Sequence, residues 1–341
     1  MQYFDSDYME GAHPAILERL IETNREKTPG YGTDAYCEEA RQKIREACGC
    51  PEAEVRFLVG GTQTNMIMIH SLLKHCEGVV AVETSHISAH EAGAIEATGH
   101  KVLTLPGVDG KLMPGPLREW LAAWTEDENR EHTVFPGMVY ISHPTEYGTL
   151  YTKKELEVLH GICEFYQIPL YLDGARLGYG LVADGTDVTL EVIGKNCDCF
   201  YIGGTKVGAL FGEAVVIPKP GRIPRLFTII KQRGGLLAKG RILGIQFATL
   251  FTDDLYYKIS RHAVDMAMKI KAGLIEKGYS LYLDSMTNQQ FVVLDKEQKE
   301  RLEKDVSFGF WERLDDGRTV VRIATSWATR EKDVDQLLSL L

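Results

Sequence analysis

The sequence lacks an excess of positive charge and any long apolar run. Its 38 Lys and Arg residues are outnumbered by 48 Asp and Glu residues, which gives a net charge of -10. Nucleic acids and anionic membrane surfaces bind basic faces of proteins, so we expect neither as a partner. No apolar stretch approaches the roughly 18 to 20 residues that cross a bilayer, so we expect no membrane segment.

The cysteines show neither a disulfide framework nor a metal-binding spacing. There are seven, an odd number, and Cys48/Cys50 and Cys197/Cys199 form C-x-C pairs. In a chain of 341 residues this pattern favours reduced thiols. Neither pair has the C-x2-C spacing typical of zinc, and His90-Glu91 does not continue into H-E-x-x-H, so we predict no metal site.

The N-terminal residues carry acids where a secretory signal would carry Lys or Arg followed by an apolar run. We therefore expect a cytoplasmic protein. With 44% hydrophobic residues, the 341-residue chain is ordinary globular material and long enough for more than one domain.

Short apolar, β-prone runs alternate with amphipathic helical patterns through the first two thirds of the chain. This alternation predicts an α/β fold with a mostly parallel sheet between helices. From about Thr252 a long helix and several short strands indicate a smaller α+β domain. We expect a helical segment at 1–44 that completes the site, a large domain at 45–250 and a small domain at 251–341.

Several helix boundaries can be predicted from local signals. Pro14 suits the first turn of a helix, and Asp34 suits the N-cap of the next one. Thr152 and Glu155 have the spacing of a capping box. A further helix is expected at 88–97, before Gly99.

Two strand ends carry polar side chains of complementary chemistry. The run Ile168 to Leu172 ends at Asp173, and the run Phe200 to Ile202 ends shortly before Lys206. Open α/β sheets bind ligands at the carboxyl ends of their strands. A lysine that forms a Schiff base and a carboxylate that partners a pyridinium nitrogen are what pyridoxal phosphate requires. The pair predicts a pyridoxal phosphate site.

A glycine-rich turn offers a place for the phosphate of such a cofactor. Val55 to Val59 has strand composition, Gly60, Gly61 and Thr62 follow, and an apolar helical segment comes next. Free N–H groups and the helix dipole both attract an anion at such a helix start. The alternative is a plain connection between a strand and a helix.

An ordered set of motifs over nearly the whole chain resembles the threonine aldolase and β-eliminating lyase family of fold-type I pyridoxal phosphate enzymes. These motifs are Ser6-Asp7, Tyr31-Gly32, Gly61-Thr62-Gln63-x-Asn65, His86 with Glu91-Ala92-Gly93, Asp173-Gly174-Ala175-Arg176, Thr205-Lys206, Lys231 with Gly234-Gly235, Thr287-Asn288 and Val321-Arg322.

The resemblance implies a role for each matching residue. The catalytic set is Lys206, which holds the cofactor, His86, which stacks on its ring and takes part in proton transfer, Asp173, which holds the ring nitrogen, and Arg176, which lies against the cofactor or the substrate carboxylate. The remaining implied contacts are Gly60, Gly61, Thr62 and Lys231 for the cofactor, and Ser6, Tyr31, Glu146 and Arg322 for the substrate.

The chain departs from the family pattern at Thr145-Glu146-Tyr147-Gly148, where threonine aldolases tend to carry Thr-His-x-Gly. Glu146 could serve as a base there, or His143 could take that place. The resemblance implies a pyridoxal-phosphate-dependent aldehyde-lyase that cleaves a β-hydroxy-α-amino acid, like threonine or allo-threonine, to glycine and an aldehyde. It also implies a homodimer or homotetramer.

Two alternatives stay open on the sequence. One is another reaction of the same cofactor on an amino acid, namely β-elimination, racemisation or transamination. The other, of a different class, is a protein of this fold that binds a ligand without catalysis.

Overall fold

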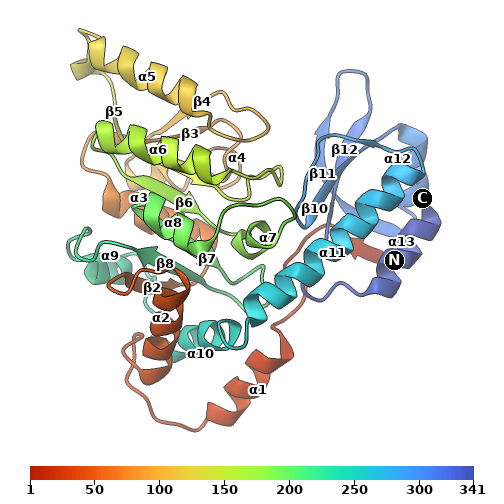
Figure 1. Cartoon of the computed structure of the whole chain (residues 1–341), viewed down its shortest axis with the longest axis horizontal. Coiled ribbons are helices and arrows are strands. Elements are labelled where there is room, and N and C mark those ends of the chain that lie inside the picture. The colour runs from red at the N-terminus through yellow and green to blue at the C-terminus, as the bar shows by residue number, and fades with distance from the viewer.

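The computed structural model describes residues 1–341 and contains two sheets, which lie side by side in Figure 1. The larger sheet has the order β2-β8-β7-β6-β5-β3-β4. Its strands are β2 (Glu54–Leu58), β3 (Glu77–Val82), β4 (Val102–Leu105), β5 (Phe135–Ser142), β6 (Leu170–Asp173), β7 (Cys199–Gly203) and β8 (Glu213–Ile217). Pairings from β4 through β7 are parallel, and only β8 runs antiparallel to its neighbours. The predicted α/β fold with a mostly parallel sheet is confirmed.

Helices cover both faces of this sheet, and this is why its strands read as unbroken apolar runs. Along β3, Val80 and Val82 pack into one core, while Val79 and Ala81 pack into the other. The first face is covered by α2 (Ala35–Ala47), α5 (Pro114–Glu126), α6 (Lys153–Phe165), α8 (Leu190–Asn196) and α10 (Arg241–Leu250). The second face is covered by α3 (Gly61–Leu72), α4 (His86–Ala89) and α9 (Leu226–Gln232).

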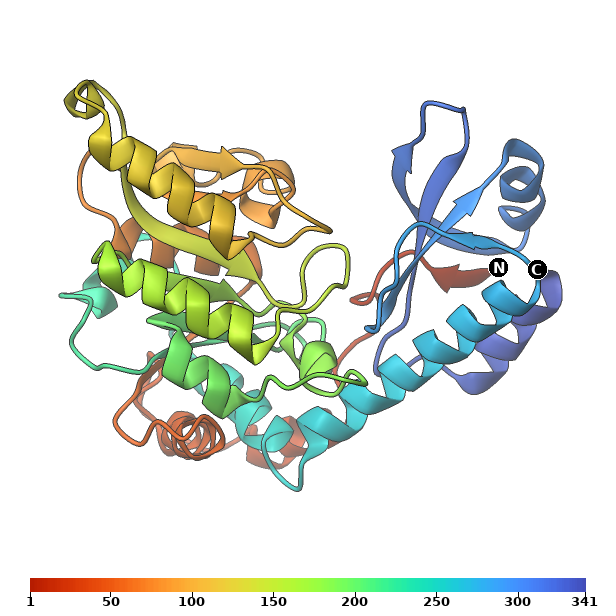
Figure 2. The same ribbon diagram turned by 45° about the horizontal axis from the view of Figure 1, so that its top comes forward.

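The smaller sheet has the order β1-β11-β12-β10-β9; the N-terminus lies at β1, and the C-terminus lies at the end of α13 (Figure 1). Its strands are β1 (Gln2–Phe4), β9 (Ser280–Leu281), β10 (Gln289–Leu294), β11 (Val306–Arg313) and β12 (Thr319–Ala324). Three helices accompany it: α11 (Leu255–Glu276), α12 (Lys296–Leu302) and α13 (Glu331–Leu340). Figure 2 shows α11 running from the larger part to the smaller one, and its residues enter the cores of both.

The N-terminal strand differs from the helical segment expected at 1–44. Gln2 to Phe4 pair in parallel with Val306 to Phe308, so the chain begins inside the smaller sheet. A three-residue strand with no neighbouring partner in the sequence leaves no periodic signal. The helices expected after it are present as α1 (Pro14–Thr23) and α2.

The predicted caps are confirmed, whereas one predicted helix is wrong. The Asp34 side chain accepts from the backbone of α2, and the capping box opens α6. The helix expected at 88–97 is broken into α4 and a single 3-10 turn at Glu96–Thr98. Ala92 and Gly93 between them adopt positive φ angles of 51° and 72°, which no right-handed helix accommodates. The short helices α7 (Leu177–Leu181), α8 and α10 were not expected.

No helix of the protein is both long enough and apolar enough to cross a membrane.

Candidate active site

The carboxyl ends of β5, β6 and β7 meet at a small pocket, which we call the inner pocket. It collects the ends of three strands, the start of α3 and the start of α4 in one place. Its lining residues are Gly61, His86, Ser142, Pro144, Thr145, Glu146, Asp173, Ala175, Arg176, Tyr201 and Lys206. The sequence therefore predicted both the edge of the sheet and the two strand ends that carry Asp173 and Lys206.

Asp173 is an ionised carboxylate held by four donors. The hydroxyl groups of Tyr140 and Tyr201, the side-chain amide of Asn65 and the backbone N–H of Ala175 all donate to it. Burial alone would raise the pKa of Asp173, but the charge of His86 and these donors hold it below its usual value. The negative charge is therefore fixed beneath the pocket.

A sharp turn after β7 presents Lys206, and Glu213 holds that turn in place. Glu213, on β8, accepts from the hydroxyl of Thr205 at 2.8 Å and from the backbone N–H of Gly204 at 3.1 Å. Burial and the neighbouring charge of Arg176 lower the pKa of Lys206, against the opposing effect of nearby carboxylates. A lowered pKa favours the neutral amine, which is the nucleophilic form.

His86 is oriented by a buried carboxylate. Its Nδ1 lies 2.9 Å from Oε1 of Glu91, and the same oxygen accepts from Asn65 at 2.7 Å. Since Asn65 also donates to Asp173, one chain of hydrogen bonds joins the histidine to the carboxylate. Nδ1 of His86 is therefore engaged with Glu91, and Nε2 is left for a ligand in the pocket.

Arg176 lies in the inner pocket, and two of its nitrogens form hydrogen bonds with Asp7. Its Nε and one terminal nitrogen donate to the two Asp7 oxygens at 2.7 and 2.9 Å. Asp7 is 1% exposed and also accepts from Asn288. The arginine therefore forms a buried ion pair that ties the N-terminal segment to the large domain, rather than an exposed one.

A larger outer cleft of about 540 Å³ opens from the inner pocket toward the smaller sheet. Arg322 of β12 and Arg176 both line it, together with Lys206 and Glu146. Arg322 donates to Gln289 at 3.2 Å and to the backbone carbonyl of Asp5 at 2.9 Å, while its Nε has no partner. Two guanidinium groups in one cleft suit a carboxylate ligand.

Glu146 and His143, the two residues considered at the departure from the family pattern, lie in different surroundings. Glu146 lines both the inner pocket and the outer cleft. His143 is fully buried, and its Nδ1 accepts from the backbone N–H of Tyr151 at 3.3 Å. Burial lowers the pKa of His143 to about 4, so it is neutral and held away from the cleft.

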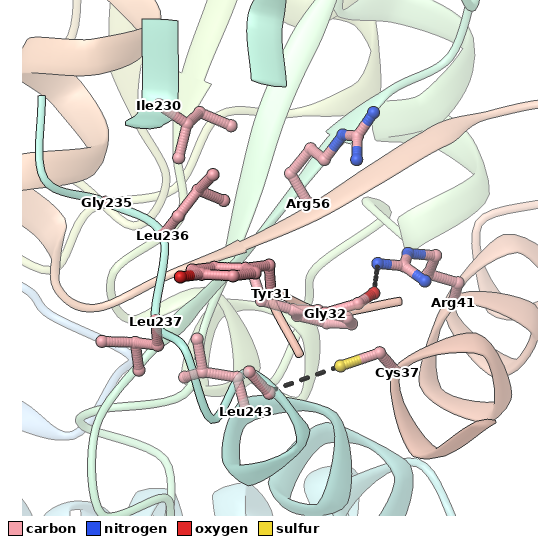
Figure 3. Close-up of a pocket in the computed structure, with 12 residues that line it drawn as sticks. Tyr31, Gly32, Cys37, Arg41, Arg56, Ile230, Gly235, Leu236, Leu237 and Leu243 are labelled. Atoms are coloured by element: carbon pink, nitrogen blue, oxygen red, sulfur yellow. Dashed lines mark hydrogen bonds between the residues drawn. The ribbon is translucent and has the colours of Figure 1, made fainter. Parts of the chain in front are cut away.

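Tyr31 lines a separate hollow on the same chain, and Lys231 lies beside its ring. Figure 3 shows Tyr31 beside Leu236 and Leu237, with Arg41 bonded to the Gly32 carbonyl. The Lys231 ammonium lies 4.4 Å from the Tyr31 ring centroid. Tyr31 is 44% exposed, and the residues around this hollow are distinct from those of the inner pocket and the outer cleft.

The remaining predicted residues lie at the edges of the site. Gly60 is the N-cap of α3, and Thr62 stands exposed in its first turn. Ser6 accepts from the backbone N–H of Tyr8, and it is Tyr8 that lines the outer cleft. The site brings together no group of three or more His, Cys, Asp or Glu side chains placed to hold a metal ion.

The residues present fit pyridoxal phosphate. A carboxylate kept ionised, a buried lysine and the open N-terminus of α3 at Gly61 surround one pocket. A Cβ on Gly61 would stand 3.2 Å from the Tyr201 hydroxyl, so the glycine keeps this end of the helix open. The carboxylate suits the ring nitrogen of the cofactor, the lysine suits its aldehyde, and the helix start suits its phosphate.

Sequence reasoning missed the residues that support these groups. Asn65, Glu91 and Asp7 stand inside matched motifs, and their position there was the available signal. Tyr140, Tyr201 and Glu213 lie in strands that read as ordinary buried runs, and nothing local marks them.

Comparison with known proteins gives matches along the whole chain. A model described as β-eliminating lyase matches residues 4–302. The low specificity L-threonine aldolase of Pseudomonas sp. (strain NCIMB 10558) is 27% identical over 339 residues, covering 98% of this chain and 96% of the relative. A solved structure of Leishmania major threonine aldolase is 43% identical, with a TM-score of 0.96, covering 100% of this chain and 98% of that one.

A putative L-allo-threonine aldolase of Listeria monocytogenes EGD-E has the same fold, with 18% identity, a TM-score of 0.74, and coverage of 100% of this chain and 95% of that one.

Proposed function

The chain belongs to the β-eliminating lyase family of pyridoxal phosphate enzymes, and from that premise we propose that it cleaves a β-hydroxy-α-amino acid to glycine and an aldehyde. Threonine is the substrate that the names of its relatives suggest, and allo-threonine differs from it only in configuration at Cβ. The observation that carries the proposal is the convergence of Lys206 and Asp173 in one buried pocket beneath two arginines.

Each residue of the inner pocket has a task in this reaction. When bound there, pyridoxal phosphate supplies an electron-withdrawing ring that takes up the electron pair of a bond broken at Cα. Lys206, with its lowered pKa, is the amine that bonds to the cofactor. Asp173 holds a proton at the ring nitrogen because its own pKa is low. His86 would lie against the ring, and because Nδ1 is held by Glu91, its Nε2 would serve proton transfer.

Binding contacts complete the proposal. The N–H groups at Gly60, Gly61 and Thr62 receive the cofactor phosphate at the start of α3. Arg322 and Arg176 hold the substrate carboxylate in the outer cleft. The side chain beyond Cβ then extends toward Glu146, while Ser6 lies near the mouth of the cleft.

We propose that the active enzyme is at least a homodimer. Tyr31 and Lys231 match family site motifs but lie together outside the inner pocket and the outer cleft, and the exposed Tyr31 ring is available to a second copy. A two-fold arrangement would let this hollow complete the partner's site. The segments 1–44, 45–250 and 251–341 remain the units we propose, with β1 of the first segment joined to the smaller sheet of the third. The seven unpaired cysteines support a reducing, cytoplasmic location.

The test is direct. Purified protein with pyridoxal phosphate is incubated with L-threonine, L-allo-threonine and phenylserine, and glycine and aldehyde are measured. We expect glycine from at least one of them, in equal amount to the aldehyde. No glycine from any of them would discard the proposal, and pyruvate with ammonia from serine would indicate β-elimination instead.

A further inference from the structure

Glu146 is a buried carboxylate with one oxygen held and the other without a partner. Oε1 accepts from the Ser142 hydroxyl at 2.7 Å and from the backbone N–H of His86 at 3.0 Å. Oε2 is buried and has no hydrogen-bond partner. The side chain is 9% exposed, and no lysine or arginine pairs with it. One oxygen of this carboxylate is therefore held in place by hydrogen bonds, and the other makes none.

Of the buried acids near the pocket, Glu91 also has one oxygen without a partner, but Glu146 is the one of the two that lines the cavities. Asp173 and Glu213 each have both oxygens hydrogen-bonded, and Asp7 has both oxygens bonded to Arg176. A buried oxygen without a partner costs free energy comparable to a lost hydrogen bond, so such atoms call for an explanation. Glu146 lines both the inner pocket and the outer cleft, so a ligand that bridges the two lies against this carboxylate.

The location of Glu146 tells which part of a substrate it meets. Lys206 marks where the reacting Cα lies, and Arg322 marks the carboxylate end, all within the same cleft. Glu146 lies in the loop after β5 and is hydrogen-bonded to Ser142, the last residue of that strand, which pairs with Asp173 at the end of β6. A substituent on Cβ that extends from Cα between these groups has this carboxylate as its polar neighbour.

We propose that the carboxylate of Glu146 accepts the proton of the substrate's β-hydroxyl group during carbon–carbon cleavage, and that Ser142 positions it. This inference rests on the proposed function. The O–H bond breaks, and its electron pair becomes the second carbon–oxygen bond of the departing aldehyde. The Cα–Cβ pair stays with the carbon that becomes glycine, which later takes up one proton, so atoms and electrons balance.

The surroundings suit a proton acceptor. Burial raises the pKa of Glu146 above that of an exposed glutamate, against the effect of the Ser142 hydrogen bond, and a higher pKa makes a stronger base. His143, the other residue considered at this place, is buried and bonded to Tyr151. His86 also lines both cavities, and the experiment separates it from Glu146.

The experiment compares two reactions of the holoenzyme. Cleavage of L-allo-threonine breaks a bond at Cβ and needs the hydroxyl proton removed, whereas exchange of the glycine α-proton with D2O does not. For Glu146→Gln we expect cleavage kcat/KM to fall about 10²- to 10⁴-fold, the range of general-base contributions. Glycine exchange, followed by NMR, should stay within about threefold, since it uses no base at Cβ, and the cofactor absorbance should be unchanged.

Three further variants test the inference from other sides. Glu146→Asp restores a carboxylate and should recover part of the cleavage rate that Glu146→Gln loses. Glu83→Gln removes an exposed carboxylate from the same cleft, to which we assign no role, and should cleave like the wild type. Ser142→Ala should lower cleavage kcat with little change in KM, and it should shift the pH profile of cleavage but not of exchange.

Three results would each have a clear meaning. Normal cleavage by Glu146→Gln would overturn the inference and point to His86 as the base. Equal losses of cleavage and exchange would also overturn it, because a structural role affects both. If the wild-type enzyme exchanges glycine protons but cleaves no β-hydroxy amino acid, the proposed function fails instead.

Discussion

Replacing Asp7 with Asn should destabilise the protein strongly, because Asp7 forms a buried ion pair that joins three parts of the chain. Its side chain is 0% exposed and binds Arg176 through both oxygens, while Asn288 donates to one of them. Asp7 follows β1, Arg176 precedes α7 and Asn288 precedes β10. The substitution keeps the shape of the side chain and removes its charge, so Arg176 stays buried without a counter-ion.

Two estimates of the magnitude agree. Burial would raise the pKa of Asp7, yet the charge and hydrogen bonds of Arg176 lower it from 3.8 to about 2. At about 1.4 kcal/mol for each pKa unit, this shift corresponds to roughly 2 to 3 kcal/mol. Removing one partner of a buried ion pair typically costs about 3 to 5 kcal/mol. We expect a loss of about 3 kcal/mol at pH 7.

The pH dependence gives the sign. A carboxylate whose pKa is lowered by folding contributes stability above its unfolded pKa of 3.8, and that stability is lost as the pH falls through about 2. The free-energy gap between wild type and Asp7→Asn should therefore be constant from pH 5 to 8 and should close in acid.

The assay is urea denaturation of both proteins at equal protein and cofactor concentrations, since binding and association shift apparent stability. Asp316→Asn breaks the fully exposed ion pair with Arg318 and serves as the control, with an unchanged midpoint expected. Equal stability of Asp7→Asn and wild type at pH 7 would refute the reasoning.

Three further predictions concern the site and its supports. Gly174→Ala places a Cβ 2.0 Å from the Tyr201 carbonyl oxygen, so the substitution should displace the neighbouring Asp173. Absorbance titration should then show cofactor binding weakened at least tenfold, which corresponds to about 1.4 kcal/mol. The control is Gly161→Ala, whose added Cβ has nothing within 4 Å, and it should bind the cofactor normally. Burial raises the pKa of Glu213 to about 8. Folding favours the neutral form of Glu213, so this residue stabilises the protein less as the pH rises from 4.5 toward 8. Over this range the Tm of the cofactor-free wild type should fall more than the Tm of cofactor-free Glu213→Gln. Equal changes of Tm with pH in the two proteins would contradict this. Arg322→Lys loses planar two-point binding of the carboxylate and should raise KM about tenfold with little change in kcat, and an unchanged KM would remove Arg322 from the binding site.

The sequence allowed the proposed catalytic pair to be placed because each member lies at or just after the end of an apolar strand. Asp173 ends β6 and Lys206 follows β7, and adjacent parallel strands bring their carboxyl ends together. The sheet itself could be predicted for the same reason, since its strands are buried on both faces and read as continuous apolar runs.

The residues that hold the site in place could not be predicted from local patterns in the sequence. The ion pair between Asp7 and Arg176 joins residues 169 positions apart, and β1 finds its partner strand near the far end of the chain. Tyr140 and Tyr201 look like any aromatic residue in a buried strand until the structure shows their hydroxyls on Asp173. Such contacts depend on the tertiary fold and leave no spacing in the sequence.

The helix predicted at 88–97 was wrong. The segment has an apolar, helix-prone composition, but Ala92 and Gly93 adopt positive φ angles, and these interrupt the helix. That break is what directs Glu91 back to His86.

The most direct measurement identifies the lysine that carries the cofactor. The holoenzyme is reduced with borohydride and digested, and the peptide bearing the pyridoxyl group is found by mass. The label is predicted on Lys206 alone, and Lys206→Ala should lose both the label and the cleavage activity. A label on another lysine, such as Lys231, or no label at all, would contradict the assignment of the site.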